Sequence, residues 1–567
     1  MKFSHWREMV CTIVVALGLA GCGGGSAPVA SITSSSTTPL SAGQVASPSA
    51  APKVTHYAAS RFAEQATFGP TPALVAELRA KGFERWIDEQ FALPFVPIDV
   101  KPAEAFYALT DQEPVPSSIG TYLQREFVRL SLVAPDQLRL RVTWSLSQFV
   151  VVNRAANRPT AEVGWVNLLY HHSYGHYGPL LREASTNALM GWFLNNNQNR
   201  PKSAECPHCA PNENFARELM QLFSIGVIKL GPDGTPLRDG RGRLIETYTQ
   251  ADVEELARAL TGWKFQPRTE GVPDRGNRSW VMPMVPTTWP PERDSGRKQL
   301  LGRVFPAGQS QDKDLDDIVE MLMAHPNTAP FVALRIIQHL VKSDPSPAYV
   351  GRVAAKFREN GSGVRGDMKA VVKAVLLDTE ARAGDAPERL RADDGKFREP
   401  MLHRMALFRG MGCRASFVFG PEQYWLVGNQ QPFNQDSVFS FYAPTDRAPG
   451  SNLLAPEQRL VGAPELTSRL NETNSLRFNR TTRLNDMQPL RDAGCNVDLF
   501  VDAYTRSARD FLDLLSERYF RGAMPPTLRN NMEQMIKAPN WNSNDMSEGA
   551  MRMLAFASST PYYGVIK

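Results

Sequence analysis

The 567-residue sequence lacks the short motifs that mark several common enzyme classes. It has no glycine-rich phosphate loop, and no Gly-x-Ser-x-Gly elbow or Ser-x-x-Lys pair lies in a setting that would support catalysis. It also has no repeat of fixed period, so the sequence does not predict a solenoid. These absences leave no evident serine nucleophile, and any chemistry must come from other residue types.

The sequence also has no large excess of basic or of acidic residues. Lys and Arg total 63, and Asp and Glu total 58, which gives a net charge of +5 at pH 7. No run of basic residues alternates with aromatic residues, so the sequence does not predict nucleic-acid binding. Hydrophobic residues make up 42% of the chain. That share is enough for a sizeable core, and the length allows one large domain or two ordinary ones.

The apolar run at residues 10–19 is too short to remain in a membrane as a spanning helix. A short basic segment precedes it, and residues 19–22 read Leu-Ala-Gly-Cys. This pattern resembles a bacterial lipobox, with cleavage before Cys22 and lipidation of its thiol. We therefore predict a lipoprotein signal peptide at residues 1–21. An ordinary secretory signal that is cut nearby is the alternative.

Residues 22–52 carry no charge and are rich in Ser, Thr, Ala, Gly and Pro. Such a composition cannot bury a core, so this stretch is expected to form a flexible tether. Gly23 rather than Asp follows the cysteine, which by resemblance favours the outer membrane of a Gram-negative bacterium. We expect an exported protein, attached to the membrane through lipidated Cys22. Its main helical domain spans residues 53–463, and a C-terminal helical segment at 464–567 packs on that domain.

Cysteine is scarce, but its count agrees with export. Besides Cys11 and Cys22, the chain has four cysteines: Cys206, Cys209, Cys413 and Cys495. An even number in an oxidising compartment suggests two disulfides, for which three pairings are possible, and we favour Cys206–Cys209 and Cys413–Cys495. The Cys-Pro-His-Cys segment looks like the redox pair of thioredoxin-like oxidases, but it follows a loop rather than a strand. A stapled loop is the expected role, and redox activity or a bound metal are the alternatives.

Residues 211–226, PNENFARELMQLFSIG, have the pattern of a short helix. Apolar residues fall at i, i+4, i+7 and i+8 from Phe215, which places them on one stripe. Asn212 is expected to cap the free amides, and Glu213 lies in the first turn, where the helix dipole favours an acid. Gly226 is expected to end the run.

Residues 248–263, YTQADVEELARALTGW, predict a second helix. Thr249 and Asp252 have the spacing of a capping box, with a shorter acid than usual. Apolar residues then follow at i, i+3, i+4 and i+7 from Val253, and Gly262 closes the segment.

Acids, amides and a guanidinium gather on these two predicted helices, which we expect to pack side by side. The candidate catalytic residues are Glu213, Arg217, Glu218 and Asp252, and the candidate substrate-binding residues are Asn212, Asn214, Glu255 and Trp263. Paired carboxylates can act as acid and base or hold a hard cation, and a guanidinium can clamp a carboxylate or phosphate. The alternative is a salt-bridge network that locks the two helices together.

The same segments carry a family resemblance. NENFARELMQLFSIG followed by YTQADVEELARALTGW resembles the signature of the bacterial DUF1800 family, a domain of unknown function. Three further segments agree: RFAEQATFGPT at 61–71, ALMGWFLNNNQN at 188–199 and AHPNTAPFVALRIIQHLV at 324–341. The resemblance covers roughly residues 55–460 and implies a mainly helical, exported protein without an established reaction. Family members often have an aspartate after a histidine where this chain has Arg293 and Asp294. They also tend to have Gly-Trp where this chain reads QPFNQDSVFSFYAP.

The rest of the chain is mostly helical in pattern. Residues 136–152 are apolar on most faces, which predicts a central helix. Residues 227–247 carry two turn signals between β-prone runs, which predicts a hairpin, and their acids lack the spacing of an EF-hand loop. Residues 266–300 are rich in proline and lack periodicity, as in a lid or site wall. We expect a mainly α fold: one large, irregular multi-helical domain with a small β-hairpin insertion and long Pro-rich loops.

Histidines offer a weaker pattern. His172 and His176 are four apart, the spacing that a metal needs on one helical face, and His171 adjoins them. No Glu lies between the pair, as a zinc protease would require, and neighbouring tyrosines suggest a packed or sugar-facing surface. We assign no metal and no cofactor. His325 precedes a proline at a predicted helix end, where it is expected to interact with the last carbonyls.

Three functions fit these patterns. The first is binding or assembly of an envelope polymer or partner protein, for which the aromatic segments 263–289 and 433–442 would suit sugar stacking. The second is hydrolysis of extracellular polysaccharide by the carboxylates of the two signature helices. The third is thiol oxidoreduction at Cys206 and Cys209. An open cleft that holds carboxylates of raised pKa would favour the hydrolase, and carboxylates sealed by arginines would oppose it.

Overall fold

The structure is a computed structural model, and it describes residues 54–103, 121–153, 158–267, 278–414, 430–462, 467, 488–538 and 546–567. The chain divides into two units, Met1–Pro52 and Lys53–Lys567. All described residues belong to the second unit. The predicted signal peptide and tether, with Cys22, lie outside them.

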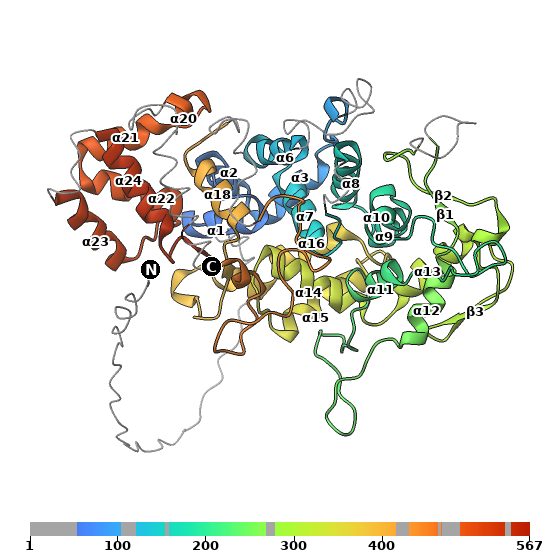
Figure 1. Ribbon diagram of the computed structural model, residues 1–567. Coiled ribbons are helices and arrows are strands. Elements are labelled where there is room, and N and C mark those ends of the chain that lie inside the picture. The colour runs from blue at the N-terminus through green and yellow to red at the C-terminus, as the bar shows by residue number, and fades with distance from the viewer. Residues whose placement is uncertain are drawn as a thin grey trace, which may run out of the picture. The chain divides into compact units, whose positions relative to one another are not determined.

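The second unit is mainly α-helical, as predicted (Figure 1). Its first helices are α1 His56–Ala66, α2 Pro72–Lys81, α3 Phe83–Ala92, α6 Tyr122–Val133, α7 Gln137–Ser147, α8 Pro159–His172, α9 Tyr177–Thr186, α10 Ala188–Phe193, α11 Asn214–Gln221 and α12 Gln250–Ala259. The later ones are α13 Gln311–Ala324, α14 Thr328–Leu340, α15 Pro347–Arg358, α16 Met368–Leu377, α17 Thr379–Ala383, α18 Pro400–Gly410, α20 Gln488–Asp492, α21 Val497–Arg506, α22 Ala508–Tyr519, α23 Pro526–Lys537 and α24 Met546–Ser559. Within the described ranges, none of the helices has an apolar stretch long enough to cross a membrane.

Strands form small antiparallel pairs. They are β1 Trp263–Lys264 with β2 Val285–Pro286, β3 Lys298–Leu300 with β4 Arg303–Phe305, and β5 Lys396–Phe397 with β6 Val565–Ile566. Residues 266–300 were expected to be irregular, and the described part of them instead contains β2 and β3. β3 packs against α12, so this segment covers one side of the second signature helix.

Capping side chains divide residues 367–382 and 497–519, and the periodicity of each range predicts a single helix. Asp378 accepts a hydrogen bond from the N–H of Glu380 and separates α16 from α17. Ser507 accepts from the N–H of Asp510 and separates α21 from α22. Asp and Ser side chains compete with the helix for backbone donors, so they begin a new helix where apolar spacing alone predicts continuation.

Residues 227–247, which we call the arm, form the predicted β insertion. The arm has three short extended segments, whereas a hairpin has two. The N–H of Lys229 donates to the carbonyl of Ile245, that of Ile245 to Leu237, and that of Leu237 back to Lys229. These three bonds link the three extended segments pairwise, so each segment is held by the other two. The arm therefore has an internal framework although most of its side chains are exposed.

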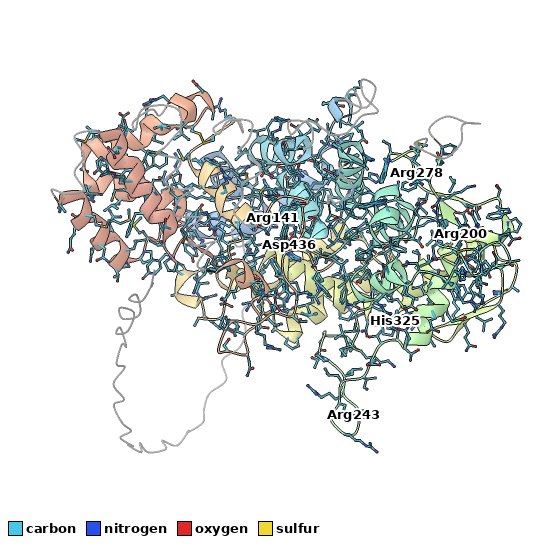
Figure 2. All side chains as sticks on the ribbon, in the orientation of Figure 1. Arg141, Arg200, Arg243, Arg278, His325 and Asp436 are labelled. Carbon is cyan, nitrogen blue, oxygen red and sulfur yellow. A yellow bond between two sulfur atoms is a disulfide. The ribbon has the colours of Figure 1, made fainter. Side chains whose placement is uncertain are left out.

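A single buried amide fixes the base of the arm. Asn327 donates from Nδ2 to the carbonyls of Ile225 at 2.9 Å and Ile228 at 2.7 Å, and its Oδ1 accepts from the N–H of Leu230 at 2.9 Å. The arm leaves the helical body from this point, with Arg243 near its tip (Figure 2). Asn327 thus satisfies backbone groups that would otherwise be buried without partners.

The core is centred on α7, as predicted, and every residue of this helix is buried. α14 packs against α7, α15 and α16. Near the end of the chain, α22 packs against α18, and the disulfide Cys413–Cys495 joins the segments that follow α18 and precede α21. The pairing of β5 with β6 adds residues 565–566 to the same body.

Candidate functional site

The two signature helices, α11 and α12, pack against each other, as the sequence predicts. α12 begins with the predicted capping box. The side chain of Thr249 accepts from the N–H of Asp252, and Asp252 accepts from the N–H of Thr249 at 2.8 Å. The box satisfies two backbone donors at the free end of the helix and fixes where α12 starts.

α11 differs from the expectation at its start. It begins at Asn214 without a side-chain cap, and Asn212, expected to cap it, accepts from the N–H of Asn214 at 3.0 Å in a local turn. The helix ends at Gln221, and the chain then turns through Gly226, where φ is +68°. Glycine adopts this conformation at no steric cost, so it completes the turn that leads into the arm.

Glu213, Arg217 and Gln250 join the first turns of the two helices. Nη2 of Arg217 donates to Glu213 at 2.8 Å and to Gln250 at 3.1 Å, and Nε2 of Gln250 donates to Glu213 at 2.9 Å. The Glu213 and Arg217 side chains are 35% and 39% exposed. Ion pairs of this exposure stabilise a fold by less than about 1 kcal/mol, so the trio orients the two helices more than it stabilises them.

The other candidate acids on α12 bind the β3–β4 hairpin. Asp252 accepts from the N–H of Leu301 at 2.8 Å, and Glu255 accepts from the N–H of Gln299 at 2.7 Å. Burial acts to raise the pKa of Asp252, but the backbone donors outweigh it and the pKa is lowered. The predicted convergence of acids is therefore incomplete, because Asp252 and Glu255 hold a neighbouring hairpin rather than face Glu213.

Glu218 differs from the other acids because burial raises its pKa and Arg217 only partly opposes this effect. Its Oε2 is buried and has no hydrogen-bond partner within the described residues. Burial, with a contribution from Glu218, also raises the pKa of Tyr248 to about 12. The signature helices thus contain one carboxyl biased toward its neutral form, not a matched pair.

Residues 195–199, the asparagine loop, connect α10 with the segment that leads to α11. Asn195 and Gln198 have φ of 58° and 60°. A side chain makes this left-handed backbone unfavourable, so the surrounding structure must hold it in place. The N–H of Gln198 donates to the carbonyl of Trp263 at 2.8 Å, which ties the loop to β1.

Asparagine side chains of this loop also bind both signature helices. Oδ1 of Asn199 accepts from the N–H of Asn212 at 2.7 Å, and its Nδ2 donates to the carbonyl of Ala257 in α12 at 3.3 Å. Nδ2 of Asn214 donates to Oδ1 of Asn195 at 3.0 Å. The loop is therefore the point at which α10, α11, α12 and β1 meet.

A cavity of about 420 Å³ opens beside the asparagine loop. Its lining residues are Gly191, Trp192, Phe193, Asn195 and Asn197. The ring of Trp192 lies edge-on to that of Trp280, with centroids 6.3 Å apart. Sites for small molecules typically combine apolar and aromatic walls with a few placed polar groups, and this cavity has both.

Trp263, predicted to bind substrate, has only 2% of its surface exposed. Its ring is part of the core, so the expectation of an accessible stacking face at this position is wrong. Trp192, Phe193 and Trp280 are only half-buried. Partly exposed aromatic rings thus come from Trp280 of the expected segment 263–289 and also from Trp192 and Phe193 at the end of α10, which the sequence analysis did not single out.

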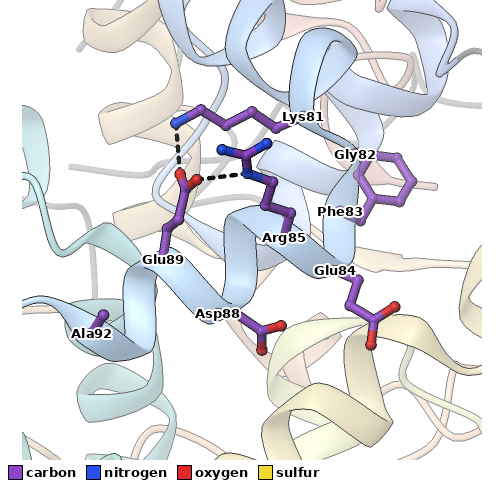
Figure 3. Close-up of a pocket in the computed structure, with 8 residues that line it drawn as sticks. All are labelled: Lys81, Gly82, Phe83, Glu84, Arg85, Asp88, Glu89 and Ala92. Carbon is purple, nitrogen blue, oxygen red and sulfur yellow. Dashed lines mark hydrogen bonds and ion pairs between the residues drawn. The ribbon is translucent and has the colours of Figure 1, made fainter.

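A larger hollow, of about 630 Å³, lies on α2 and α3 (Figure 3). Its charged side chains pair with one another or with neighbours. Lys81 binds Glu89 at 2.5 Å, Arg85 binds Glu89 at 3.0 Å, and Lys373 binds Asp88 at 2.8 Å. Because these pairs satisfy one another, the size of the hollow does not by itself indicate a ligand site.

One family matches the chain over most of its length. The model described as "Protein of unknown function (DUF1800)" matches residues 61–565. The chain belongs to the DUF1800 family. No curated protein and no solved structure matches it. The matched span continues beyond the expected residues 55–460 and includes the C-terminal helices.

Several segments that carry the family resemblance meet in this DUF1800 protein. The asparagine loop ends the 188–199 segment and binds α11 and α12, and the 324–341 segment supplies Asn327 at the base of the arm. The residues that depart from the family pattern have structural partners. Arg293 pairs with buried Asp314, and Asp294 pairs with Arg258 at 2.8 Å.

A second group of charged residues, which sequence reasoning missed, lies inside this DUF1800 protein. Lys396 binds Glu399 at 2.7 Å, and both side chains are at most 1% exposed. Gln430 donates to the other Glu399 oxygen at 2.6 Å, and Arg141 donates to the carbonyl of His339 at 2.5 Å. Burial acts to raise the pKa of Glu399, but Lys396 and its neighbours outweigh it and lower it to about 2. We call this group the buried charge cluster.

His339 should make the stability of the protein fall in acid. Burial, with Lys396 adding to it, lowers the pKa of His339 to about 3. The unfolded imidazole has a pKa of about 6.5, so below that pH the unfolded chain binds a proton that the folded protein does not. The stabilisation is complete above pH ~6.5 and is lost progressively toward pH ~3. Between pH 7 and pH 5 we expect a loss of about 2 kcal/mol from this residue.

Urea unfolding at several pH values measures this effect. The His339→Gln variant should lose part of the pH dependence, whereas the exposed His208→Gln variant should follow the wild type. Equal slopes of unfolding free energy against pH in the wild type and His339→Gln would contradict the prediction.

Two further histidines, His172 and His325, hold local structure. Nε2 of His172 lies 3.0 Å from Oε2 of Glu183. His325 was expected to bind the last carbonyls of its helix, but its Nδ1 instead accepts from the N–H of Asn327 at 3.1 Å. In the part of the chain that the structure describes, no three His, Cys, Asp or Glu side chains are placed to hold a metal ion.

Both favoured disulfides, Cys206–Cys209 and Cys413–Cys495, are present. The first pair lies in the loop between the asparagine loop and α11, which begins only at Asn214. Neither sulfur is at a helix N-terminus, the position that lowers a thiol pKa in thioredoxin-like proteins. The geometry agrees with the expected stapled loop.

Proposed function

We propose that this DUF1800 protein is an exported, lipid-anchored protein of the cell envelope that binds a polysaccharide chain in the cavity beside the asparagine loop. The observation that carries the proposal is one cavity lined by Trp192 and Phe193 together with the amides of Asn195 and Asn197. A sugar ring stacks its C–H face on an aromatic ring and bonds amides through its hydroxyl edge.

The way the loop is held supports a binding role. Asn195 lies in the left-handed region and its side chain is bound by Asn214, so its amide is fixed before a ligand arrives. A surface that is already ordered loses less conformational entropy on binding. Backbone strain of this kind is also concentrated at ligand sites.

Export and anchoring rest on the sequence. The short apolar run, the Leu-Ala-Gly-Cys stretch at residues 19–22 and the uncharged segment up to residue 52 have the order of a lipoprotein leader and tether. Two disulfides agree with an oxidising compartment. The membrane is thus the proposed partner at Cys22, and an envelope polymer the proposed partner at the cavity.

Binding is favoured over hydrolysis by the state of the acids. A glycosidase of the common type needs two carboxyl groups on either side of one bond. Glu218 has a raised pKa, but Asp252 and Glu255 are occupied by backbone donors of the β3–β4 hairpin. Glu213 is held by Arg217 and Gln250.

A glycan array screened with the soluble unit Lys53–Lys567 tests the proposal. We expect binding to at least one envelope or extracellular polysaccharide, and at least a tenfold loss of affinity in Trp192→Ala, because a stacked aromatic ring contributes about 1–3 kcal/mol. Tyr562→Ala is the matched control, since Tyr562 is 50% exposed and lies in the turn between α24 and β6. Equal affinities of the wild type and Trp192→Ala would contradict the proposed site, and no binding to any glycan would contradict the function.

A further inference from the structure

We infer that the cavity beside the asparagine loop selects polysaccharides built from acetamido sugars, whose amide carbonyl accepts a hydrogen bond from Asn197. This inference rests on the proposed function, because it specifies the class of sugar that the same cavity takes. It is carried by the orientation of the two asparagine amides in the cavity lining, whose oxygens are bound within the protein.

Asn197 has one end of its amide fixed by the backbone. Its Oδ1 accepts from the N–H of Phe265 at 3.1 Å. A backbone N–H can only donate, so this bond determines which end of the side-chain amide faces Phe265. Within the described residues, Nδ2 of Asn197 has no hydrogen-bond partner. Because Asn197 is half-buried in the cavity lining, its amide hydrogens are the groups that it offers to a ligand.

Asn195, at the exposed end of the lining, has the same arrangement. Its Oδ1 accepts from Nδ2 of Asn214 at 3.0 Å, which leaves its own Nδ2 for a ligand. The loop backbone is also bound internally, because the N–H of Asn197 donates to the carbonyl of Gly191 at 2.9 Å. The indole N–H of Trp192, the remaining polar side-chain group of the lining, can only donate. The side chains of the cavity therefore present mainly hydrogen-bond donors.

An acetamido group matches such a lining better than a hydroxyl group. Its carbonyl oxygen only accepts, so it meets the amide hydrogens of Asn197 without bringing a proton that needs an acceptor. A hydroxyl brings such a proton, and a donor left unpaired in a partly desolvated site costs free energy. The acetyl methyl group is apolar and gains from contact with the half-buried rings of Trp192 and Phe193.

The lining also favours a neutral ligand group over an ion. Its five residues, Gly191, Trp192, Phe193, Asn195 and Asn197, are all uncharged. An ion that left water for this lining would lose hydration without gaining an opposite charge from these residues. An acetamido group carries no charge and keeps the strong acceptor that the amides of the asparagines can bind.

Titration calorimetry on the full-length chain, in a non-ionic detergent without sugar groups, tests the inference. The probes are N-acetylchitopentaose and cellopentaose, which differ only in the acetamido group that replaces one hydroxyl of each ring. We expect the acetylated chain to bind at least about tenfold more tightly, as one added hydrogen bond and a partly buried methyl group predict. The preference should not change with salt, because no charged group takes part.

The Asn197→Asp variant tests the donor itself. It keeps the oxygen that accepts from Phe265 and replaces the nitrogen by a second acceptor, so the loop stays anchored while the donor is lost. Affinity for N-acetylchitopentaose should fall at least about tenfold, and affinity for cellopentaose should stay the same or rise, because a carboxylate accepts from hydroxyls. Asn531→Asp makes the same change at an exposed position of α23, which packs on α22 and α24, and should bind like the wild type.

Saturation-transfer NMR on the wild type tests the orientation of the sugar without any variant. Saturation of the aromatic protons should reach the acetyl methyl protons of N-acetylchitopentaose more strongly than its ring C–H protons, because the methyl group lies on Trp192 and Phe193. A weaker signal at the methyl protons would place the acetamido group outside the cavity and overturn the inference.

Four binding results would also overturn it. Equal binding of the two pentasaccharides would remove the selectivity and leave the proposed sugar binding intact. Equal losses in Asn197→Asp and Asn531→Asp would attribute the effect to added charge. An N-acetylated peptide that binds as tightly as N-acetylchitopentaose would assign the cavity to acyl groups rather than to sugars. Binding of other glycans on the array but of neither pentasaccharide would overturn the inference alone, whereas no binding to any glycan would overturn the proposed function with it.

Discussion

Replacing Cys413 and Cys495 together by serine is expected to lower the free energy of unfolding by about 4–5 kcal/mol. The bond closes a loop with a sequence separation of 82 residues. In the chain-entropy account, a loop of that length restricts the unfolded chain strongly, and removing the bond stabilises the unfolded state by a corresponding amount. Both sulfurs belong to buried residues, so the folded state also loses packing.

The second disulfide provides a matched control. Cys206 and Cys209 are only three positions apart, and their double serine variant should lose about 2 kcal/mol. Denaturant unfolding of the unit Lys53–Lys567 under non-reducing conditions measures both variants. Losses of equal size from the two pairs would contradict the prediction, because loop length would then not determine the effect.

Replacing Lys396 by methionine is expected to cost about 3–5 kcal/mol, because it leaves Glu399 charged and buried without its cation. Glu399 is 0% exposed, and the side-chain donors that remain to it, the amide of Gln430 at 2.6 Å and the hydroxyl of Tyr442, are uncharged. The lowered pKa of Glu399, about 2 in the folded protein, depends on Lys396 and should rise in the variant. Acid should then destabilise the variant less steeply than the wild type below pH ~4.5, because the folded and unfolded pKa values come closer.

Two further variants check this prediction. Lys396→Met combined with Glu399→Gln removes both charges and should recover part of the stability, since the uncompensated charge causes most of the loss. Lys313→Met removes an ion pair with Asp317 in which the lysine is 59% exposed, and it should cost less than about 1 kcal/mol. A Lys396→Met variant as stable as Lys313→Met would show that the buried pair does not contribute as expected.

Local signals predicted most elements of the fold. The Thr249–Asp252 box, the turns of the arm and both disulfides depend on residues whose chemistry acts within a few positions or, for cysteine, through a specific covalent bond. Helix breaks at Asp378 and Ser507 were missed because apolar spacing continues across them. A capping side chain at each position was the available signal, and it outweighed the periodicity.

The site was predicted less well, for a physical reason. Periodicity gives the face of a helix on which an acid lies but not the element that will cover that face. Asp252 and Glu255 lie on α12 as expected, and the β3–β4 hairpin rather than α11 supplies their partners. The buried charge cluster did leave a signal in the sequence, because Arg335, Gln338 and His339 interrupt a largely apolar helix.

The pairing of β5 with β6 has a consequence for the order in which the protein matures. The N–H of Arg398 donates to the carbonyl of Gly564 at 2.8 Å, and the guanidinium of Arg398 lies over the ring of Tyr563. The segment beside the buried charge cluster therefore cannot complete its contacts until the ribosome has synthesised residues 563–566, near the end of the chain. A nascent chain that stalls before residue 563 would expose this partly built centre to proteases and chaperones, so quality control would discard late-truncated products although nearly all helices had been synthesised.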